Sequence, residues 1–495
     1  MVPIEVMLFL YKKGGKKMKD FVKAITKREE DFAQWYTDVV LKAELASYSS
    51  VKGCMVIRPT GYALWEGIQQ YIDRHLKATG HENVYMPLLI PEGKLKQEAE
   101  HVEGFAPELA WITETGEEKL AERLAIRPTS EVLFAEHFKE IIHSHRDLPK
   151  RYNQWANVVR LEKNTRPFLR TTEFLWQEGH TCHETHEEAQ EEVMAILDLY
   201  TAVCEELLAI PVVKGRKTAR ERFAGARETY TLETLMYDGK ALQIATSHDL
   251  GDVFSSAFGI EFTNREGIDT PVYQSSWGIT TRTIGALIMV HGDDRGLMLP
   301  PRIAPIQVII VPIAQHKEGV IAAGESILAR LQEKGIRTKI DLSDKQPGWK
   351  FNESEMKGIP IRIEMGPRDM EAGQVIVVRR DTGEKTAVAM EGLEAYVTEL
   401  LETIQRNLFE QAKSRNEANT LYTESAEEFT RKIKAGGFAV TPHCGEESCE
   451  EAIKTETTAT ARCMAFTDEE KDLTGKTCPH CGKPAVSLIH FARAY

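Results

Sequence analysis

The spacing of apolar residues along the first 300 positions predicts an alternation of helices and extended strands. Apolar residues recur every three or four positions in five segments that we expect to be helical: 21–42, 61–79, 131–145, 184–208 and 283–290. Two extended runs, 152–162 and 168–178, flank the polar residues 163–166 and predict a long antiparallel hairpin. These elements predict one large α+β domain over residues 21–298, built around antiparallel strands.

A proline-rich run, Leu299-Pro-Pro-Arg-Ile-Ala-Pro305, marks a change of pattern. Beyond it, short apolar strands alternate with amphipathic helices, which is typical of an α/β domain. We place this second domain at residues 299–405. A long helical pattern over 393–416 leads into a cysteine-rich end, and we expect residues 406–495 to form a small third domain of α+β type.

Composition narrows the class of protein. The 495 residues carry a formal net charge of -13, which disfavours binding of nucleic acid through a broad basic surface. No stretch approaches the roughly 18 uninterrupted apolar residues of a membrane span, so the sequence predicts a soluble, cytoplasmic protein. Residues 1–20 place a short apolar run before lysines, the reverse of a secretory signal. We interpret them as a tail, with Met18 as an alternative start.

The cysteines indicate a metal site near the C-terminus. Five of the eight lie between residues 444 and 481. The pairs Cys444-x4-Cys449 and Cys478-x2-Cys481 can present four thiolates tetrahedrally, which predicts structural Zn²⁺. Four thiolates leave no open position for catalysis. Cys463 is then expected to be a small buried residue and not a ligand.

Two other motifs admit competing interpretations. The stretch Gly319-Val-Ile-Ala-Ala-Gly-Glu-Ser326 has the glycine spacing of a phosphate-binding loop, but Glu325 stands in the lysine position. That substitution favours an ordinary helix start. His180-Thr-Cys-His-Glu-Thr-His186 could hold a metal, yet His180 and His183 would point to opposite faces of a strand. A polar strand end is the simpler interpretation.

Charge and apolar surface are mixed most densely in Arg166-Pro-Phe-Leu-Arg-Thr-Thr-Glu-Phe-Leu-Trp-Gln-Glu-Gly-His-Thr181. Just before it, Arg160 and Glu162 would share one strand face, where a solvated salt bridge is the alternative to a functional site. The charged residues recur beside Trp176 and Trp277, which favours a site for a charged ligand.

These motifs resemble those of the class II aminoacyl-tRNA synthetases, and within them the prolyl-tRNA synthetases. The three class motifs occur in order: a helix and strand ending in Val84-Tyr-Met-Pro87, Arg160-Leu-Glu162 through Trp176, and Gly278-Ile-Thr-Thr-Arg282. Further segments match the prolyl type: 127–131, 174–181, 247–249, 275–278, 347–351 and 366–369. The C-terminal Tyr495 and the short distance between motifs 2 and 3 are similar to the archaeal and eukaryotic-like branch, which has no editing insertion.

The resemblance implies both a fold and a reaction. The fold would be a class II catalytic domain with an antiparallel sheet, followed by an α/β anticodon-binding domain and a small zinc-binding domain. The reaction would be ATP-dependent ligation of L-proline to tRNA(Pro) through a prolyl-adenylate, with release of AMP and pyrophosphate. Mg²⁺ would be the cofactor of this step, and a homodimer is the assembly that the class implies.

The resemblance also assigns roles to single residues. Phosphate charge calls for positioned cations, so Arg160 and Arg282 would act in catalysis together with Glu131. The ATP site would comprise Arg160, Glu162, Thr171, Thr172, Gln243, Thr246, Thr280 and Arg282. The proline site would comprise Thr129, Glu131, Arg160, Trp176, Glu178, His248, Ser275 and Gly278. The guanines of the anticodon would be read by Glu355, Arg362, Arg368 and Asp369, since arginine can bind a guanine edge through two hydrogen bonds.

Two alternatives remain open at this point. One is a sister synthetase of the threonyl or glycyl type, although a threonyl enzyme would need zinc inside its amino-acid pocket. The other is a synthetase-like RNA-binding regulator that has lost catalysis. The presence of both Arg160 and Arg282 disfavours this second alternative.

Overall fold

The structure of the chain, a computed structural model, describes residues 25–101 and 109–495. The predicted tail of residues 1–20 and the alternative start at Met18 lie outside the described residues. The chain divides into two compact units, which we call the small unit and the large unit. The small unit combines the described residues up to Ala43 with Gly292–Met298 and Ile306–Tyr396. The large unit combines the described residues of Glu44–His291 with Leu299–Pro305 and Val397–Tyr495.

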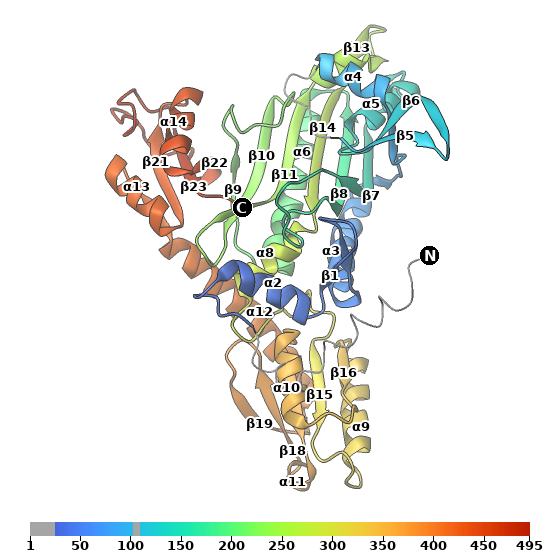
Figure 1. Cartoon of the computed structure of the whole chain (residues 1–495), viewed down its shortest axis with the longest axis vertical. Helices are drawn as coiled ribbons and strands as arrows, with labels where there is room; N and C mark the ends of the chain where they lie inside the picture. Colours follow the sequence, from blue (N-terminus) through green and yellow to red (C-terminus); the bar gives the residue numbers. More distant parts are fainter. Residues whose placement is uncertain (1–24, 102–108) are drawn as a thin grey trace. The chain divides into compact units, whose positions relative to one another are not determined.

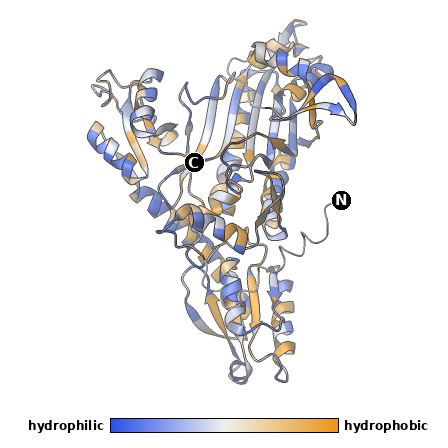
Figure 2. Cartoon of the chain, viewed as in Figure 1, coloured by the Kyte–Doolittle hydropathy of each residue, from blue (hydrophilic) through white to orange (hydrophobic). Residues whose placement is uncertain are grey.

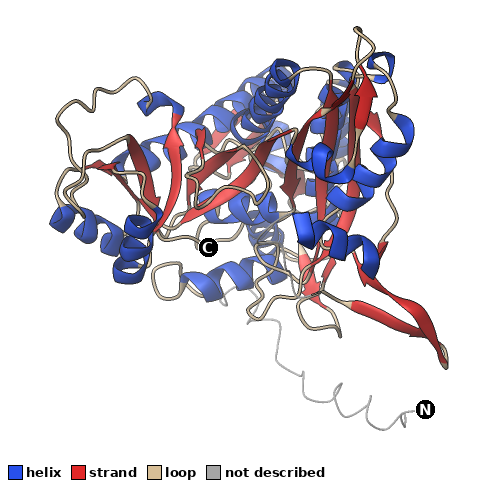
Figure 3. Cartoon of the chain, turned by 90° about the horizontal axis from the view of Figure 1, so that it is seen from above, coloured by secondary structure: helices blue, strands red, loops and turns tan. Residues whose placement is uncertain are grey.

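The large unit is built on an eleven-stranded sheet (Figures 1 and 3). Neighbouring strands are antiparallel except for two parallel pairs at the two ends, β3 with β7 and β20 with β21. In spatial order the strands are β20 (Thr420–Tyr422), β21 (Phe438–His443), β23 (Ser487–Ala492), β22 (Thr460–Ala465), β9 (Val213–Arg216), β10 (Glu228–Leu235), β11 (Ala241–Gly251), β14 (Tyr273–Thr280), β8 (Glu173–His183), β7 (Lys150–Val159) and β3 (Glu82–Asn83). The predicted α+β class with a large antiparallel sheet is thus confirmed.

One face of this sheet is covered by α6 (His186–Ala202), which continues as a π-helical turn, Val203–Leu207. Val193, Leu197 and Tyr200 of α6 are fully buried as the helix packs on β11 and β14. The helices α3 (Pro59–Ala78) and α8 (Arg282–His291) also belong to this unit. The apolar residues of α8 are buried all around the helix, which is why its sequence shows no polar face.

A second core lies between α5 (Glu131–Ile141) and α7 (Val253–Phe258), where Phe134, Phe138 and Phe254 are buried. Shorter elements complete this part of the unit: β1 (Ala46–Tyr48), β2 (Met55–Ile57), β4 (Leu89–Pro91), α4 (Glu92–His101), β5 (Trp111–Thr115), β6 (Glu118–Ile126), β12 (Glu261–Thr263) and β13 (Asp269–Pro271). The sequence predicted that the strand of motif 1 ends in residues 84–87. In the structure these residues connect two short strands, β3 and β4.

The predicted hairpin is present as β7 and β8, but its connection is longer than expected. The strands pair from Lys150 with Cys182 to Val159 with Glu173. Arg160 and Glu162 therefore lie in the loop and not in a strand, so the expected same-face geometry does not apply to them. The loop is held by its own backbone contacts, including a hydrogen bond of 2.8 Å from the amide of Arg160 to the carbonyl of Thr172.

The C-terminal residues continue the large sheet and do not form a sheet of their own. β22 pairs with β9, so that the strands of residues 420–492 extend the sheet that carries β8, β11 and β14. Behind these strands, α12 (Leu393–Ala418) leads to α13 (Ala426–Ala435) and α14 (Glu447–Thr457). Phe429, Ile453 and Phe491 form the local core. Among the described residues, no helix combines the length and the apolar character that crossing a membrane requires.

The small unit contains a mixed five-stranded sheet, as the alternating pattern predicted. The strand order is β16 (Thr338–Ile340), β15 (Val308–Pro312), β17 (Ile361–Met365), β18 (Gln374–Arg379) and β19 (Lys385–Ala389). β15 pairs in parallel with β16 and β17, and all five of its residues are buried, which Figure 2 shows as a hydrophobic ribbon. The helices of this unit are α2 (Phe32–Lys42), α9 (Val320–Glu333), α10 (Pro347–Met356) and α11 (Pro367–Glu371).

Candidate active site

A cavity of about 300 Å³ lies on the face of the large sheet that α6 does not cover. Alternate side chains of a strand point to opposite faces of the sheet. On β8, Trp176, Glu178 and His180 therefore share the face with the cavity and line it. The opposite set faces α6, as the hydrogen bond of 2.5 Å from the Tyr200 hydroxyl to Gln177 shows. Thirteen residues that the resemblance assigned to ATP or proline line this one cavity: Thr129, Glu131, Arg160, Glu162, Thr171, Trp176, Glu178, Gln243, Thr246, His248, Gly278, Thr280 and Arg282.

Arg160 enters the cavity from the loop after β7. Its Nε donates to the carbonyl of Pro128 at 3.0 Å, and its guanidinium lies 5.5 Å and 5.7 Å from the ring centres of Phe174 and Trp176. These contacts restrict a long side chain that would otherwise be mobile. Burial lowers the pKa of Arg160, while the carboxylates of Glu131 and Glu178 oppose that shift.

Arg282 is the first residue of α8, directly beyond the end of β14. Its guanidinium donates to the carbonyls of Leu169 at 3.3 Å and Gln243 at 3.5 Å. Burial, and then the neighbouring guanidinium groups of Arg160 and Arg170, lowers the pKa of Arg282 to about 10. The group stays charged at neutral pH. Two neighbouring guanidinium groups that repel each other are best stabilised by an anion between them, so this part of the cavity favours a polyphosphate.

Two carboxylates also line the cavity. Glu131 is the first residue of α5 and its carboxylate meets the hydroxyl of Thr129. Glu178 is 1% exposed and accepts hydrogen bonds from Ser130 at 2.5 Å and Gln154 at 2.6 Å. Ser130 occupies the N-cap position of α5, but its hydroxyl donates to Glu178 and not to the backbone of the helix.

His248 lies on β11, and its side chain lines the same cavity. Its Nδ1 lies 3.0 Å from the hydroxyl of Thr229, and its ring packs 4.6 Å from Phe223. Burial, together with the nearby His180, lowers the pKa of His248 to about 3. The imidazole is therefore neutral at physiological pH, and it forms a wall of the cavity without adding positive charge.

Two of the assigned residues do not line the cavity. The hydroxyl of Ser275 lies 2.5 Å from that of Thr181, on the face of the sheet that points towards α6. Its neighbour Ser276 lines the cavity instead, as alternation along β14 requires. Thr172 turns its side chain to Gly53, and its amide donates to the carbonyl of Gly53 at 2.8 Å.

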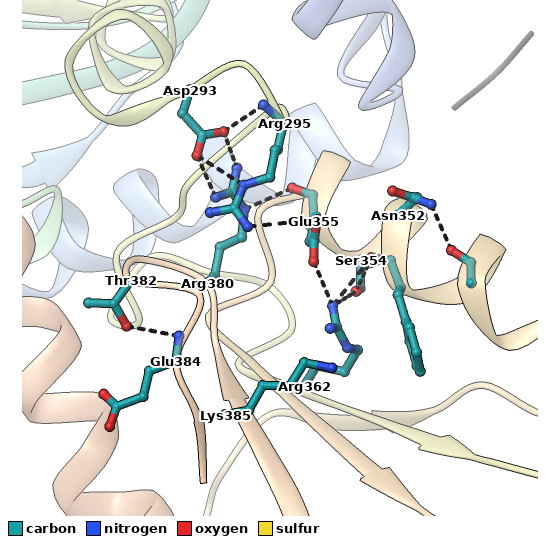
Figure 4. A network of polar contacts seen from close by, with 12 residues as sticks. Asp293, Arg295, Asn352, Ser354, Glu355, Arg362, Arg380, Thr382, Glu384 and Lys385 are labelled. Carbon is teal, nitrogen blue, oxygen red and sulfur yellow. Dashed lines mark hydrogen bonds and ion pairs between the residues drawn. The ribbon is translucent and has the colours of Figure 1, made fainter. Parts of the chain in front are cut away.

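The four residues assigned to the anticodon all lie in the small unit, and Figure 4 shows two of them, Glu355 and Arg362. Arg362, 5% exposed, contacts the carboxylate of Glu355 at 3.1 Å, and its Nη2 is 2.9 Å from Glu364. Figure 4 shows Glu355 between Arg362 and a cluster of Arg295, Arg380 and Asp293. Arg368 and Asp369 are on α11, where Asp369 accepts a hydrogen bond from the amide of Gly366 at 2.9 Å.

The four predicted metal ligands come together near α14. The sulfur atoms of Cys449 and Cys478 are 3.8 Å apart, and those of Cys444 and Cys481 are 3.5 Å apart. Tetrahedral Zn²⁺ with Zn–S bonds of about 2.3 Å requires sulfur atoms about 3.8 Å apart. Donor chemistry and spacing therefore fit Zn²⁺. The sequence did not single out His443, whose ring nitrogen lies within 4.8 Å of the donor atoms of Cys444, Cys449 and Cys478.

Comparison with known proteins decides among the class II enzymes. Three family models match successive parts of the chain: "tRNA synthetase class II core domain (G, H, P, S and T)" over residues 113–291, "Anticodon binding domain" over 307–400, and "Prolyl-tRNA synthetase, C-terminal" over 426–495. "Proline--tRNA ligase 2" of Bacillus cereus is 59% identical over 479 residues, which cover 96% of this chain and 100% of that protein. The chain belongs to the proline–tRNA ligases.

Other members of the family match over nearly the whole chain as well. "Proline--tRNA ligase" of Clostridium novyi is 56% identical over 480 residues, 97% of this chain and 100% of that protein. A crystal structure of prolyl-tRNA synthetase from Cryptosporidium parvum, complexed with halofuginone and AMPPNP, is 41% identical. It superposes with a TM-score of 0.93 and covers 96% of this chain and all of that one. The chain is therefore an enzyme that ligates proline to tRNA. The alternative of a threonyl or glycyl synthetase is wrong.

Sequence reasoning missed several residues that line the cavity. Arg170 follows Phe168 and Leu169 in the motif 2 loop and lines the cavity, and its Nε is 3.8 Å from a carboxylate oxygen of Glu162. Lys217 and Phe223 also line the cavity, and they come from the segment after β9, which contains none of the family motifs quoted above. Arg170 lies within the quoted stretch 166–181, where its positive charge could have marked it as a further phosphate-binding candidate. Nothing local in the sequence marks Lys217.

Proposed function

We propose that this proline–tRNA ligase activates L-proline as prolyl-adenylate in the cavity on β8, β11 and β14, and then transfers proline to tRNA(Pro). The observation that carries this proposal is the arrangement of charge within one cavity. Arg282 lies near the guanidinium groups of Arg160 and Arg170, which suits phosphates, and Arg160 also lies near Glu131 and Glu178, which suit an ammonium group. Such an arrangement matches a polyphosphate next to a small amine.

In the first step, a carboxylate oxygen of proline attacks the α-phosphorus of ATP. The bond from the α-phosphorus to the bridging oxygen breaks, and pyrophosphate leaves with the electron pair. Arg160, held by Pro128 and two aromatic rings, would neutralise both the reacting carboxylate and the α-phosphate. Arg282 would bind the outer phosphates. Side-chain oxygens of Gln243, Thr246 and Thr280 fit the preference of Mg²⁺, which supplies further neutralisation of the phosphates when it is bound.

Proline offers its ring shape and its secondary amine for recognition. Glu131 and Thr129 would accept the hydrogen bonds of the amine, while Trp176, His248 and Gly278 would shape the ring's surroundings. A Cβ at Gly278 would lie 3.3 Å from the carbonyl oxygen of Gln177 and 3.7 Å from the Trp176 ring, so a larger residue would intrude on this wall. Hydrogen bonds from Ser130 and Gln154 hold the carboxylate of Glu178 in place.

In the second step, the terminal ribose of tRNA would attack the carbonyl carbon of the adenylate, and AMP would leave. We assign the 3′-hydroxyl as the nucleophile by the rule of the class. Glu355, Arg362, Arg368 and Asp369 are proposed to read the anticodon, and Cys444, Cys449, Cys478 and Cys481 to hold Zn²⁺ in a structural role. The domain limits at residues 298 and 405, the homodimer and the cytoplasmic location stay predictions.

We propose further that the chain does not edit its product. Motif 2 and motif 3 are separated by about 100 residues, which form strands of the large sheet, the helices α6 and α7, the two-stranded sheet of β12 and β13, and their connections. A pocket that recognises a ring by shape discriminates weakly, because one methylene contributes only about 1–3 kcal/mol. Alanine should therefore be activated at a measurable rate and should not be cleared.

The proposal is tested by ATP–pyrophosphate exchange with the purified full chain. Exchange should depend on proline, and Arg160→Met and Arg282→Met should each abolish it while the melting temperature stays within a few degrees of the parent. Arg146→Met, on a partly exposed turn away from the cavity lining, is the matched control and should keep full exchange. Aminoacylation without proline-dependent exchange would refute the adenylate route.

A further inference from the structure

The carboxylate of Glu233 is completely buried next to the active-site cavity. Its exposed fraction is 0%, and its two oxygens are fully engaged. Oε1 accepts from Lys217 Nζ at 2.8 Å and from the Thr231 hydroxyl at 3.1 Å, whereas Oε2 accepts from Arg462 Nη2 at 2.8 Å and Nε at 3.0 Å. Burial alone would raise the pKa of Glu233, but Lys217 and Arg462 hold it below its ordinary value. The three side chains form a charged triad.

Lys217 is the member of the triad that faces the cavity. It belongs to the cavity lining although only 4% of its surface is exposed. An ammonium group has three N–H donors. Within residues 25–101 and 109–495, Nζ donates one hydrogen bond, to Glu233. Two donors therefore remain available to a ligand that enters the cavity.

The position of the triad indicates which part of a bound ligand it would contact. Glu233 pairs with Gln243 across β10 and β11, and the carbonyl of Gln243 is the one that Arg282 contacts. The triad therefore lies beside Arg282, and the charge of Arg462 contributes to the lowered pKa of Arg282. Lys217, Glu233 and Arg462 sum to one positive charge, which adds to that of Arg282. This combination favours a ligand with several negative charges over a zwitterion such as proline.

Arg462 reaches the site from the other end of the sequence. It lies on β22, whose Met464 and Ala465 pair with Arg216 and Gly215 on β9. A Cβ at Gly215 would come within 2.4 Å of the carbonyl oxygen of Met464, so the two strands approach too closely there for any larger residue. The strand that holds Arg462 in place is thus fixed directly beside the segment that carries Lys217.

We propose that Lys217 binds the triphosphate of ATP, that Glu233 orients it, and that Arg462 is a positioning residue through which the C-terminal segment completes the nucleotide site. This inference rests on the proposed use of the cavity for ATP. Glu233 performs two functions, since it holds the Lys217 ammonium in place and reduces its repulsion from Arg282. Arg462 does not need to contact ATP. It donates hydrogen bonds to Oε2 of Glu233, so that Oε1 stays directed at Lys217.

The test is ATP–pyrophosphate exchange of Lys217→Met, Arg462→Met and Arg462→Lys in the full chain. Each single variant leaves Glu233 paired with one cation, so the buried carboxylate is not orphaned. We expect Lys217→Met to raise KM for ATP tenfold or more and Arg462→Met to raise it severalfold. KM for proline should stay within twofold in both variants, and Arg462→Lys should recover at least half of the loss.

Arg431→Met on α13 is the matched control, because this arginine lies in the same C-terminal segment with a side chain that is 71% exposed. It should leave all constants unchanged. Equal increases in KM for ATP and proline, an unchanged KM for ATP in Lys217→Met, or a deficit in Arg462→Met that Arg462→Lys does not reduce would overturn the inference. If a variant has a lower melting temperature than the parent, its affinity for ATP alone is measured by calorimetry below its melting temperature. An affinity equal to that of the parent would also overturn the inference. Absence of proline-dependent exchange in the parent chain would instead refute the proposed function.

Discussion

The role of Glu131 leads to a prediction whose size can be worked out from the structure. Glu131 is the first residue of α5, and its carboxylate meets the Thr129 hydroxyl on the cavity wall. Glu131→Gln keeps the shape of the side chain and removes its charge. A hydrogen bond to a charged partner contributes about 1.5–3 kcal/mol, so KM for proline should rise about 10- to 140-fold.

Stability should change much less than proline binding. The first turn of a helix favours a negative charge by about 0.3–1 kcal/mol, and only this part is lost from the fold. KM for ATP should stay within twofold, because Arg160 and Arg282 are untouched. The assay is ATP–pyrophosphate exchange with each substrate varied in turn, alongside thermal unfolding.

Glu136→Gln is the control for this experiment. Glu136 lies on the same helix, where its 43%-exposed side chain pairs with Lys94 at the surface. This variant should leave both KM values unchanged. The assignment of Glu131 to the proline amine would be wrong if Glu131→Gln changed KM for proline by less than twofold, or raised the two KM values equally.

Four further predictions follow from other parts of the chain. Arg362→Ala should lower kcat/KM for tRNA in aminoacylation at least tenfold and spare proline-dependent exchange, since Arg362 contacts Glu355 in the small unit; equal loss in both assays would contradict this. One Zn²⁺ per chain should be found by elemental analysis, and Cys478→Ser should remove the metal and lower the melting temperature, whereas Cys204→Ser at a buried site elsewhere should retain the metal; undiminished zinc in Cys478→Ser would exclude the site. Burial lowers the pKa of His183 to about 4, that of His291 to about 4 and that of His248 to about 3. The unfolded chain then binds more protons below pH 6.5, so the free energy of unfolding should fall as pH drops from about 6.5 towards 4, by up to about 1.4 kcal/mol per pH unit for each histidine; urea titrations that show rising stability over this interval would refute it. Alanine should support pyrophosphate exchange, and alanyl-tRNA made by the chain should persist in its presence; no alanine-dependent exchange would show that the pocket is more selective than its geometry implies.

Much of the fold could be predicted because its signals are local. The apolar spacing of 61–79 and 393–416 anticipated α3 and α12 to within two residues at either end. The cysteine pairs anticipated four sulfur atoms that do meet. Strand boundaries were less accurate, because the residues around Arg160 look extended in sequence but are held as a loop by contacts with Thr172.

Which side chains line the cavity could be decided only from the strand pairing of the large sheet. Ser275 and Ser276 have the same side chain, and only the alternation imposed by pairing β14 with β8 decides that Ser276 lines the cavity. Thr172 was assigned with Thr171, yet its side chain turns to Gly53, which is more than a hundred residues away in sequence. Neither outcome follows from residue type.

The sequence by itself determined the class of fold, the order of its elements and the family, because periodicity and motif spacing are properties of neighbouring residues. The tertiary structure alone decided which distant charges share a buried carboxylate. Glu233 and Arg462 are 229 positions apart and meet only because β22 pairs with β9. Burial makes such a contact necessary, since a carboxylate without water requires partners, but the long-range strand pairing chooses which ones.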